Sequence, residues 1–433
     1  MKSCLVCPAP TVSIDMHRLL VAMTIVILSV AACSSGHVAA LDAGSGAAGA
    51  DGGAGAGVGG AGHGDAGSSA ATGGAGTGTA GAGGAVDAGV EVANDAPGER
   101  DAANGGDAAD ASGVPAVRFV GRIDRGDAKG PRFAWSGSGL VAAFDGTAVG
   151  VKLGGGQQYT VMLDGVVKPK LVPTSTATTM IASGLTSGPH VVELYRRTEA
   201  EWGESQFLGL DLGAGTLLPP PPAPARRIEV IGDSISTGFG DEGTDPCPYT
   251  IDTENHYVTW EALAARAVGA ELVTTAWEGK GLVCNVGDGP CTMPFPTYYD
   301  RSLPMRADST WDFASWQPHA VVINLGTNDF STAVDPTPQQ FSDGYVAFLR
   351  HIRGNYKDAM ILLTCGPMLG TGELQKVKDG IATAIATLGD PRVKSFDLAI
   401  QTGPTGCAGH PNVMTHQKMA DTLVAELKKD LGW

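Results

Sequence analysis

The sequence contains few positive charges, and they do not form a block. Its 433 residues include 29 Lys and Arg against 45 Asp and Glu, which gives a formal net charge of −16 at pH 7. Proteins that bind nucleic acids use clustered Lys and Arg side chains to contact the phosphates. The composition therefore argues against a nucleic-acid-binding protein, and the excess of acidic residues favours solubility.

Two other patterns are absent. The eight cysteines do not form the paired CxxC motifs of a zinc site. The apolar run from Leu19 to Ala32 is shorter than the roughly 20 residues that a membrane-spanning helix needs. This run follows a short basic segment, Met16-His17-Arg18, and is typical of the apolar region of a signal peptide.

The end of this run resembles a bacterial lipobox. In that motif the Cys of a segment such as Val30-Ala31-Ala32-Cys33-Ser34 is acylated and becomes the mature N-terminus. We expect residues 1–33 to form a signal peptide with a lipobox, Met16 being an alternative start, and Cys33 to carry the lipid. A plain signal peptide, cleaved near an incidental Cys, is the alternative. We expect a protein of the bacterial cell envelope, lipid-anchored or secreted, with membrane contact only through the lipid.

Glycine is abundant and unevenly distributed. Of 63 glycines, the excess lies within residues 41–113. Residues 34–113 consist mainly of Gly, Ala, Asp and Ser and have almost no aromatic side chains. Such a composition cannot bury enough apolar surface to offset the conformational entropy that folding removes. We predict a disordered linker over residues 34–113.

Residues 114–216 have the pattern of a β domain. Short apolar or alternating runs are separated by turn-forming pairs such as Asp145-Gly146 and Asp164-Gly165. The runs cover Leu140–Phe144, Val149–Leu153, Tyr159–Leu163 and Val191–Tyr195. The Asp164-Gly165 pair predicts a β-hairpin. Several short strands in about 100 residues indicate a β-sandwich, jelly-roll-like in type.

A Pro-rich linker is expected over residues 217–226, because a polyproline run is a stiff spacer. From residue 227 to residue 433, buried strands alternate with helical patterns, which predicts an α/β domain with a parallel sheet and flanking helices. The strands are expected at 228–231, 272–275, 320–324, 360–364 and 393–396, and amphipathic helices at 341–356 and 419–431. Ligands of such folds bind in the loops after the carboxyl ends of the strands.

Three of these loops carry residues that can perform chemistry. They contain Gly232-Asp233-Ser234, Gly326-Thr327-Asn328-Asp329 and Gly409-His410-Pro411-Asn412. A Ser at a strand-to-helix turn exposes its hydroxyl, an Asn amide can donate to a developing negative charge, and a His can accept the proton of a Ser. Each motif alone also has an ordinary explanation, namely a helix N-cap, an Asx turn or a structural His.

The order and the loop positions of the three motifs together resemble the SGNH hydrolases, also called the GDSL family, over residues 227–433. The resemblance implies that Ser234 is the nucleophile and His410 is its base. It also implies that the N–H groups of Ser234 and Gly279 and the side chain of Asn328 form the oxyanion hole.

Further motifs narrow the resemblance. The preceding β-sandwich, Gly279-Lys280-Gly281, Cys365-Gly366-Pro367-Met368 and the late Gly406–Asn412 segment are similar to carbohydrate esterase family 2, over residues 115–433. This resemblance implies a serine esterase that removes O-acetyl groups from an acetylated polysaccharide or oligosaccharide, such as xylan or glucomannan, through an acetyl-enzyme. Such a reaction needs no metal ion and no organic cofactor, and we predict neither.

One position departs from the family pattern. Ala408 stands two residues before His410, where the family often has Asp. A backbone carbonyl could fix the tautomer of His410 instead, and Glu278, next to Gly279, is another possible partner. His416 is a second candidate for the base, although the His-Pro-Asn context favours His410.

Two aromatic residues adjoin the catalytic loops. Trp277 and Phe330 are candidates for stacking on sugar rings, although such side chains more often pack in a core.

Because Ala408 replaces an Asp and the β-sandwich resembles binding modules, a weakly active or inactive carbohydrate-binding protein is an alternative function. An esterase for other small acyl esters is a second alternative.

Export to an oxidising compartment would allow disulfides. Cys4 and Cys7 lie ahead of the apolar run of the signal and are expected to be lost with the signal peptide. Cys284 and Cys291 flank a small Gly-rich loop and could pair. Another possible pair is Cys365 with Cys407, because each lies near a predicted active-site loop.

Overall fold

The computed structural model describes residues 117–287, 291–331 and 334–433. All of them belong to the second of two compact units of the chain, Asn94–Trp433. The expected signal peptide, the lipobox with Cys33, and the linker over residues 34–113 lie outside the described residues. Within the described ranges, no helix combines the length and the apolar composition needed to cross a bilayer.

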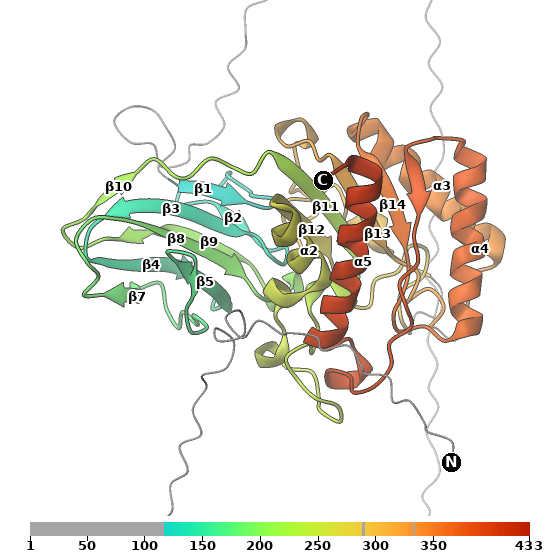
Figure 1. The fold of residues 1–433 in the computed structure, drawn as a ribbon, viewed down its shortest axis with the longest axis horizontal. Helices are drawn as coiled ribbons and strands as arrows, with labels where there is room; N and C mark the ends of the chain where they lie inside the picture. The colour runs from blue at the N-terminus through green and yellow to red at the C-terminus, as the bar shows by residue number, and fades with distance from the viewer. Residues whose placement is uncertain (1–116, 288–290, 332–333) are drawn as a thin grey trace, which may run out of the picture. The chain divides into compact units, whose positions relative to one another are not determined.

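The first part of the described chain consists of two antiparallel sheets (Figure 1). In one sheet the strand order is β1 (Val117–Val120), β3 (Gly139–Asp145), β8 (Pro189–Arg196), β5 (Tyr159–Leu163) and β6 (Val166–Val167), and β10 (Thr216–Leu218) also pairs with β3. The order in the other sheet is β2 (Arg132–Phe133), β9 (Ser205–Asp211), β4 (Ala148–Gly154) and β7 (Thr179–Ser183). The predicted β-sandwich is confirmed.

Alternating side chains explain why these strands form a two-layer core. Successive side chains of a strand point to opposite faces, and Leu140, Ala142 and Phe144 of β3 are all buried in the sandwich core. The hairpin between β5 and β6 turns at Asp164 and Gly165, whose φ angles are 53° and 74°. Positive φ at both central residues is typical of a type I′ turn, which Asp-Gly favours.

The second part of the chain is a parallel sheet with helices on both faces. Its strand order is β12 (Ala270–Ala276), β11 (Arg226–Gly232), β13 (Ala320–Asn324), β14 (Met360–Thr364) and β15 (Val393–Ser395). The helices are α1 (Ser234–Thr237), α2 (Trp260–Val268), α3 (Pro338–Asn355), α4 (Thr371–Leu388) and α5 (Val413–Leu431). Short 3₁₀ turns are η1 (Ala200–Trp202), η2 (Ile251–Thr253), η3 (His256–Val258), η4 (Phe295–Thr297), η5 (Phe313–Ser315) and η6 (Cys407–Gly409).

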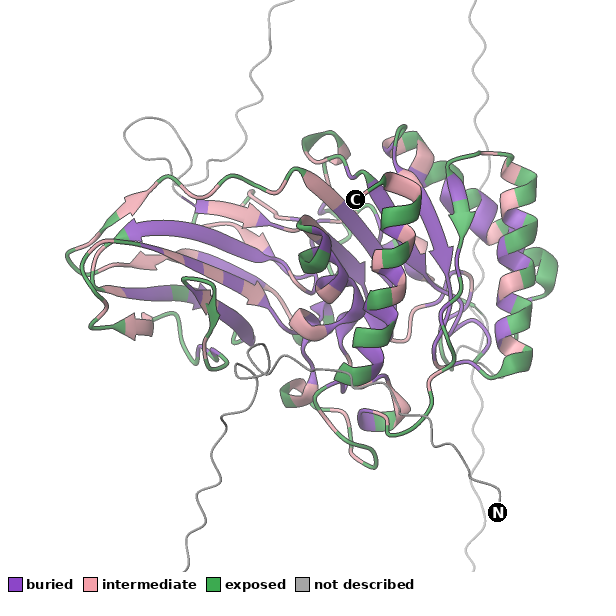
Figure 2. Ribbon diagram, in the orientation of Figure 1, coloured by how far each residue is buried: buried purple, intermediate pink, exposed green. Residues whose placement is uncertain are grey.

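Two apolar cores lie on opposite faces of this sheet. The side chains of α2 and α5 pack on one face with Ile228 and Val230 of β11, and those of α3 and α4 pack on the other face with Ile231. Every residue of β13 is buried, which Figure 2 shows for the centre of the sheet. A strand covered on both faces is a nearly continuous apolar run, as residues 320–323 of β13 are. The parallel pairing of the strands and the helices on both faces confirm the predicted parallel sheet with flanking helices.

The sandwich and the α/β part are joined through buried side chains. Arg122, between β1 and β2, donates to the carboxylate of Glu229 on β11 at 2.6 Å, and both side chains are fully buried. Trp135 of the sandwich is also fully buried, belongs to the same apolar core as α3 and α4, and donates its indole N–H to the carbonyl of Arg301 at 3.1 Å. The two folded parts therefore share one interior.

Candidate active site

The carboxyl ends of three neighbouring strands meet at one edge of the parallel sheet. Gly232, at the end of β11, is in register with Ala276 on β12 and with Asn324 on β13. Ser234, Gly279 and Asn328 follow these three positions by two, three and four residues. Parallel strands in register place the loops that follow them side by side, so the structure brings these three predicted residues to one site.

Ser234 is the first residue of a very short helix. The side chain of Asp233 caps α1 by accepting the N–H of Ile235 at 3.0 Å, and α1 ends after four residues at Gly238, whose φ is 88°. The N–H groups of a first helical turn have no partner within the helix. Ser234 retains 7% of its surface exposed, so a substrate can contact part of this residue.

The imidazole of His410 lies beside the hydroxyl of Ser234. Its Nε2 atom is 2.9 Å from Oγ of Ser234, and its Nδ1 atom is 3.3 Å from the carbonyl oxygen of Ala408. A carbonyl oxygen only accepts, so Nδ1 carries the proton and Nε2 is left to accept one. Ala408 has φ 53° and ψ 34°, a left-handed conformation that is uncommon for a residue other than Gly.

Burial keeps His410 neutral. Desolvation lowers its pKa to about 4, although its backbone hydrogen bonds to Ala408 and Cys407 raise the pKa in opposition. The ring of Phe239 lies against the imidazole, with ring centroids 4.1 Å apart. A neutral imidazole with a free Nε2 lone pair is the form required of a general base.

The loop that carries His410 is fixed to the loop that follows α1. The N–H of Cys407 donates to the carbonyl of Gly240 at 2.9 Å. A Cβ atom on Gly240 would lie 2.8 Å from Cβ of Cys407, and Gly240 has φ +65°, so only glycine fits this close approach. A disulfide between Cys247 and Cys407 joins the same two loops.

The predicted pairing of Cys365 with Cys407 is wrong. Cys365 is a free thiol, 4% exposed, at the end of β14, whereas Cys407 faces the segment after α1 and pairs with Cys247. The predicted pairing of Cys284 with Cys291 is confirmed.

The loop after β12 contains the expected oxyanion donor. Gly279 has φ +67°, a conformation that favours glycine. The side-chain amide of Asn328 donates to the carbonyl of Lys280 at 2.9 Å. An Asn amide has two N–H donors, so the second remains available to a substrate oxygen. We refer to residues 277–281 as the oxyanion loop.

Two buried aspartates in the same motifs hold the backbone around the site. Asp329 accepts the N–H groups of Leu282, Val283 and Cys284 at 2.7–3.0 Å. Burial raises its pKa to about 6 against the lowering effect of these donors. Asp233, the cap of α1, is also fully buried, and desolvation raises its pKa to about 7. Both residues lie inside the recognised motifs, but no sequence pattern marks either supporting role.

The comparisons with known proteins agree with this architecture. Residues 119–222 match the family model described as "Carbohydrate esterase 2 N-terminal", and residues 230–418 match the "GDSL-like Lipase/Acylhydrolase family". A solved family two carbohydrate esterase from Clostridium thermocellum, in complex with cellohexaose, is 38% identical with a TM-score of 0.70. The match covers 73% of this chain and 99% of that chain. The chain belongs to carbohydrate esterase family 2.

Two curated relatives of this family 2 chain have assigned names. Cellulase/esterase CelE of Acetivibrio thermocellus is 40% identical over 311 residues, which are 69% of this chain and 38% of that protein. An acetylxylan esterase / glucomannan deacetylase of Cellvibrio japonicus is 27% identical over 248 residues, which are 57% of this chain and 69% of that protein. The family 2 chain therefore spans well under half the length of the first of these relatives.

Other residues singled out from the sequence lie within the core of the family 2 fold. Trp277 and Phe330, the candidates for sugar stacking, are each 7% exposed and belong to the apolar core of α3 and α4. His416, the second candidate for the base, is 1% exposed, and its Nδ1 atom accepts the N–H of Trp260 at 3.1 Å. Desolvation lowers the pKa of His416 to about 3. The burial of His416 and its hydrogen bond to Trp260 favour a packing role for this residue.

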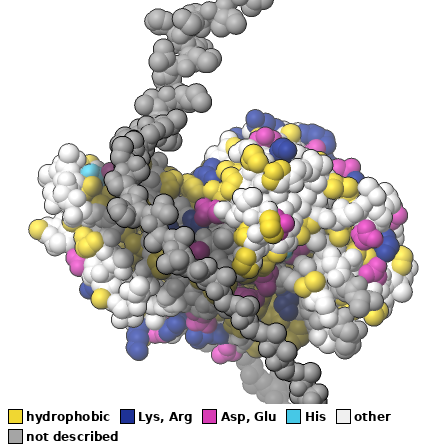
Figure 3. Space-filling model, turned by 90° about the horizontal axis from the view of Figure 1, so that it is seen from below, with side chains coloured by type: hydrophobic (Ala, Val, Ile, Leu, Met, Phe, Trp, Pro, Cys, Tyr) yellow, Lys and Arg dark blue, Asp and Glu magenta, His cyan; other side chains and the backbone are white. Residues whose placement is uncertain are grey.

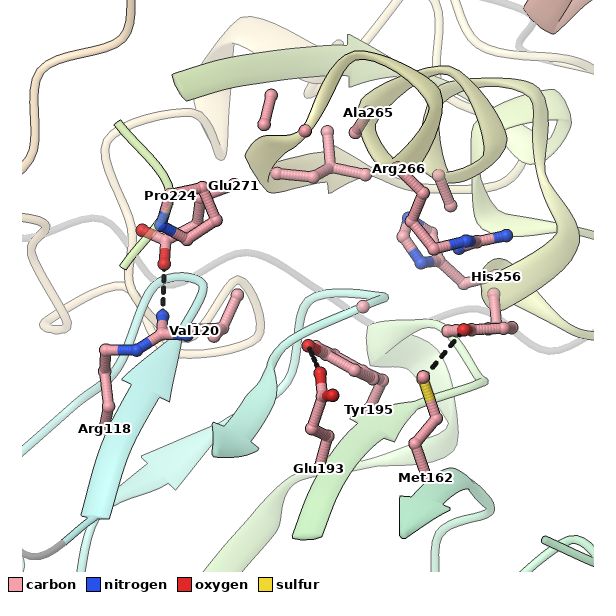
Figure 4. Close-up of a pocket in the computed structure, with 16 residues that line it drawn as sticks. Arg118, Val120, Met162, Glu193, Tyr195, Pro224, His256, Ala265, Arg266 and Glu271 are labelled. Atoms are coloured by element: carbon pink, nitrogen blue, oxygen red, sulfur yellow. Dashed lines mark hydrogen bonds and ion pairs between the residues drawn. The ribbon is translucent and has the colours of Figure 1, made fainter. Parts of the chain in front are cut away.

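A separate cavity lies between the sandwich and α2 (Figure 4). It has a volume of 290 Å³ and is lined by Arg118, Tyr195, His256, Tyr257 and Arg266, among other residues. The loops that carry Ser234, Asn328 and His410 do not contribute to its lining, so this space is distinct from the site at Ser234. Among the described residues, no three His, Cys, Asp or Glu side chains are grouped so as to hold a metal ion.

Proposed function

We propose that this chain is a serine esterase that removes O-acetyl groups from polysaccharides such as xylan or glucomannan. The observation that carries the proposal is the hydrogen bond of 2.9 Å between Oγ of Ser234 and Nε2 of a neutral His410. This geometry is within the reach required for a base that activates a nucleophile. The partner of Nδ1 is the carbonyl of Ala408. Ser234 and His410 therefore act as a dyad, without the carboxylate that forms the third member of a triad.

In the first half of the reaction, Oγ of Ser234 attacks the acetyl carbonyl carbon while Nε2 of His410 takes the hydroxyl proton. The developing oxyanion accepts hydrogen bonds from the N–H groups of Ser234 and Gly279 and from the side-chain amide of Asn328. Donors placed where charge develops stabilise the transition state; one such donor is worth about 2.7–4 kcal/mol in a well-studied protease. His410 then protonates the sugar oxygen, and the sugar leaves.

In the second half, water replaces the sugar. His410 takes a proton from the water, whose oxygen attacks the acetyl-enzyme carbonyl, and the same three donors stabilise the second oxyanion. The bond to Oγ of Ser234 breaks, His410 returns the proton to Oγ, and acetate is released. No step requires a redox partner, because only an ester bond is exchanged for water.

The substrate class is supported by the relatives. Two proteins of Cellvibrio japonicus that match this chain are named acetylxylan esterase / glucomannan deacetylase. The solved family 2 esterase with 38% identity was determined with cellohexaose, a glucan oligosaccharide. The proposed partner is therefore an acetylated polysaccharide or oligosaccharide.

We also propose that Cys33 carries a lipid and tethers the protein to the bacterial envelope through the linker over residues 34–113. The test is to compare membrane and soluble fractions of cells that express the parent or Cys33→Ser. Release of the variant into the soluble fraction is expected, and an unchanged distribution would contradict lipidation at Cys33.

The esterase proposal is tested by incubating the purified protein, Ser234→Ala and His410→Ala with acetylated xylan and acetylated glucomannan and measuring released acetate. We expect release by the parent and loss of at least roughly 1,000-fold in either variant, because nucleophile and base act as a unit. Hydrolysis of an aryl acetate without release from either glycan would show an esterase for other small esters. Glycan binding without any hydrolysis would favour the carbohydrate-binding alternative.

A further inference from the structure

Behind the oxyanion loop, the sandwich contributes a buried carboxyl group to the α/β part. Glu199 lies between β8 and η1 and is fully buried. Its Oε2 atom accepts the backbone N–H of Glu278 at 2.7 Å. Glu278 immediately precedes Gly279, so this hydrogen bond restrains the backbone one residue before the proposed oxyanion donor.

A second buried carboxyl group supports Glu199 from the segment after α1. Glu254 accepts the N–H of Glu199 at 2.8 Å, the hydroxyl of Tyr249 at 2.7 Å and the indole N–H of Trp202 at 3.0 Å. Burial raises the pKa of Glu254 to about 8, but these donors and the guanidinium of Arg196 oppose the shift. Burial therefore disfavours the charged form of Glu254, whereas its three donors and the nearby cation favour it.

The environment of Glu199 favours the protonated form. Besides the N–H of Glu278, its carboxyl group contacts the hydroxyl of Tyr249, 3.4 Å from Oε1. Burial and the carboxylates of Glu254 and Glu278 hold the pKa of Glu199 well above its ordinary value. A protonated Glu199 can donate to the Tyr249 oxygen while its carbonyl oxygen accepts from Glu278. The two buried carboxyl groups belong to one hydrogen-bonded network, so the protonation of one affects the protonation of the other.

The same network continues to the base. The ring of Tyr249 stacks on Phe239, with centroids 3.6 Å apart and planes 15° apart. Phe239 in turn lies against His410. The carboxyl pair is therefore connected to the oxyanion loop by a hydrogen bond and to the imidazole by stacked rings.

We propose that Glu199 of the sandwich is a positioning residue of the esterase site, which holds the oxyanion loop in place by accepting the N–H of Glu278. The inference rests on the proposed function, because it assigns the N–H of Gly279 to the oxyanion hole. In the described residues, the hydrogen bonds of the Glu199 side chain go to Glu278 and Tyr249, and none goes to Ser234 or His410. We therefore expect its loss to lower kcat and to leave KM unchanged.

The test is steady-state kinetics on an aryl acetate, a substrate without sugar, so that any glycan binding by the sandwich does not enter. We expect Glu199→Ala to lower kcat by roughly 10- to 100-fold, because small misplacements of catalytic groups have effects of about this size. Glu199→Gln should retain kcat within about 3-fold, since an amide offers the acceptor and the donor of a protonated carboxyl group. Glu254→Gln should lower kcat, because its amide nitrogen would replace one of the two carboxyl oxygens, and each of these oxygens accepts an N–H, one from Glu199 and the other from Trp202.

The matched control is Glu271→Gln. Glu271 also joins the two parts of the chain, through an ion pair with Arg118 and a hydrogen bond from Trp316 at 2.8 Å, but it lies at the other end of β12 from the oxyanion loop. We expect its kcat to equal that of the parent. Thermal unfolding of each variant, followed by circular dichroism, checks that the compared proteins are folded.

The outcomes separate this inference from the proposed function. An active parent with an unchanged kcat in Glu199→Ala, or with equal losses in Glu199→Ala and Glu271→Gln, would overturn the positioning role. If Glu199→Ala does not fold, Glu199→Asp decides, because its shorter side chain withdraws the acceptor from Glu278 and should lower kcat alone. A parent that hydrolyses neither aryl acetate nor acetylated glycan would instead contradict the proposed function.

Discussion

The imidazole of His410 sits in a half-buried position where no carboxylate contacts its Nδ1 atom in the described structure. The carbonyl of Ala408 accepts from Nδ1, and desolvation lowers the pKa of the imidazole to about 4. In enzymes with a complete triad, the carboxylate favours the imidazolium and orients the ring. Here the left-handed backbone at Ala408 supplies the orientation without the charge.

The low pKa of His410 predicts activity well below neutral pH. With the neutral imidazole as the proposed base, kcat/KM on an aryl acetate should be flat from pH 8 down to about pH 5 and fall with a midpoint near the pKa of about 4. An ordinary exposed His would give a midpoint at about 6.5. Rates are measured in short assays, and far-UV circular dichroism at each pH confirms that the chain remains folded. A midpoint near 6.5 would contradict the burial argument.

Sequence motifs could identify the site residues that follow strand ends, but not the distant side chains that hold the site loops in place. Ser234, Asn328 and His410 are recognisable because the motif and the preceding buried strand occur together in the sequence. Glu199 lies in another folded part, 79 residues before Glu278, whose N–H it accepts. No local pattern marks a carboxyl group whose partner is so distant, so its place could come only from the tertiary structure.

At the scale of elements, two loops rather than helices hold the part of the site that contains His410. The segment after α1 and the loop before α5 are joined by the Cys247–Cys407 disulfide and by the close contact at Gly240. The other disulfide, Cys284–Cys291, closes a loop with a sequence separation of only 7, against 160 for the first. A cross-link between distant residues restricts the unfolded chain more strongly.

Removal of the longer-range disulfide should therefore affect both stability and turnover. We expect Cys247→Ser/Cys407→Ser to lower the free energy of unfolding by about 2–5 kcal/mol and to lower kcat, because the His410 loop is released. Cys284→Ser/Cys291→Ser serves as the comparison and should lose less stability. Urea unfolding of the parent and the two double variants provides the measurement. Equal losses of stability in the two double variants would contradict the expectation that the disulfide closing the longer loop stabilises the protein more.

Most strands and two of the helices could be predicted from periodicity, whereas α4 was missed. Its apolar positions Leu374, Val377 and Ile381 have helical spacing, but Gly372 and Gly380 weaken the helical pattern. The structure explains Gly380, because a Cβ atom there would lie 2.5 Å from Cδ1 of Phe341 on α3. The residue that weakens the local helix is the one that permits the two helices to approach.

At the scale of the whole molecule, a buried ion pair connects the two folded parts. Arg122 and Glu229 are fully buried, and Glu229 also accepts the hydroxyl of Tyr299 at 3.1 Å. The Arg122 guanidinium lies 4.6 Å from the centroid of the Tyr299 ring. On the outer surface shown in Figure 3, by contrast, Lys and Arg side chains lie among Asp and Glu side chains in contact with water.

Breaking this pair should destabilise the protein strongly. Arg122→Ala leaves the carboxylate of Glu229 buried without its cation, so we expect the free energy of unfolding to fall by about 3–5 kcal/mol. Arg118→Ala is the control, because its pair with Glu271 is partly exposed and such pairs contribute about 1 kcal/mol or less. Chemical unfolding monitored by Trp fluorescence compares the two variants, and equal effects would contradict a special role for the buried pair.

The sequence by itself determined the two folded parts, the parallel sheet and the three motifs that carry Ser234, Asn328 and His410. These features depend on local periodicity and on residues close together in the chain, which a linear reading can detect. The tertiary structure alone decided which cysteine pairs with Cys407, which atom faces Nδ1 of His410, and that Glu199 contacts the oxyanion loop. Each of these depends on side chains from separate loops meeting in space, and the spacing of residues along the chain does not specify such meetings.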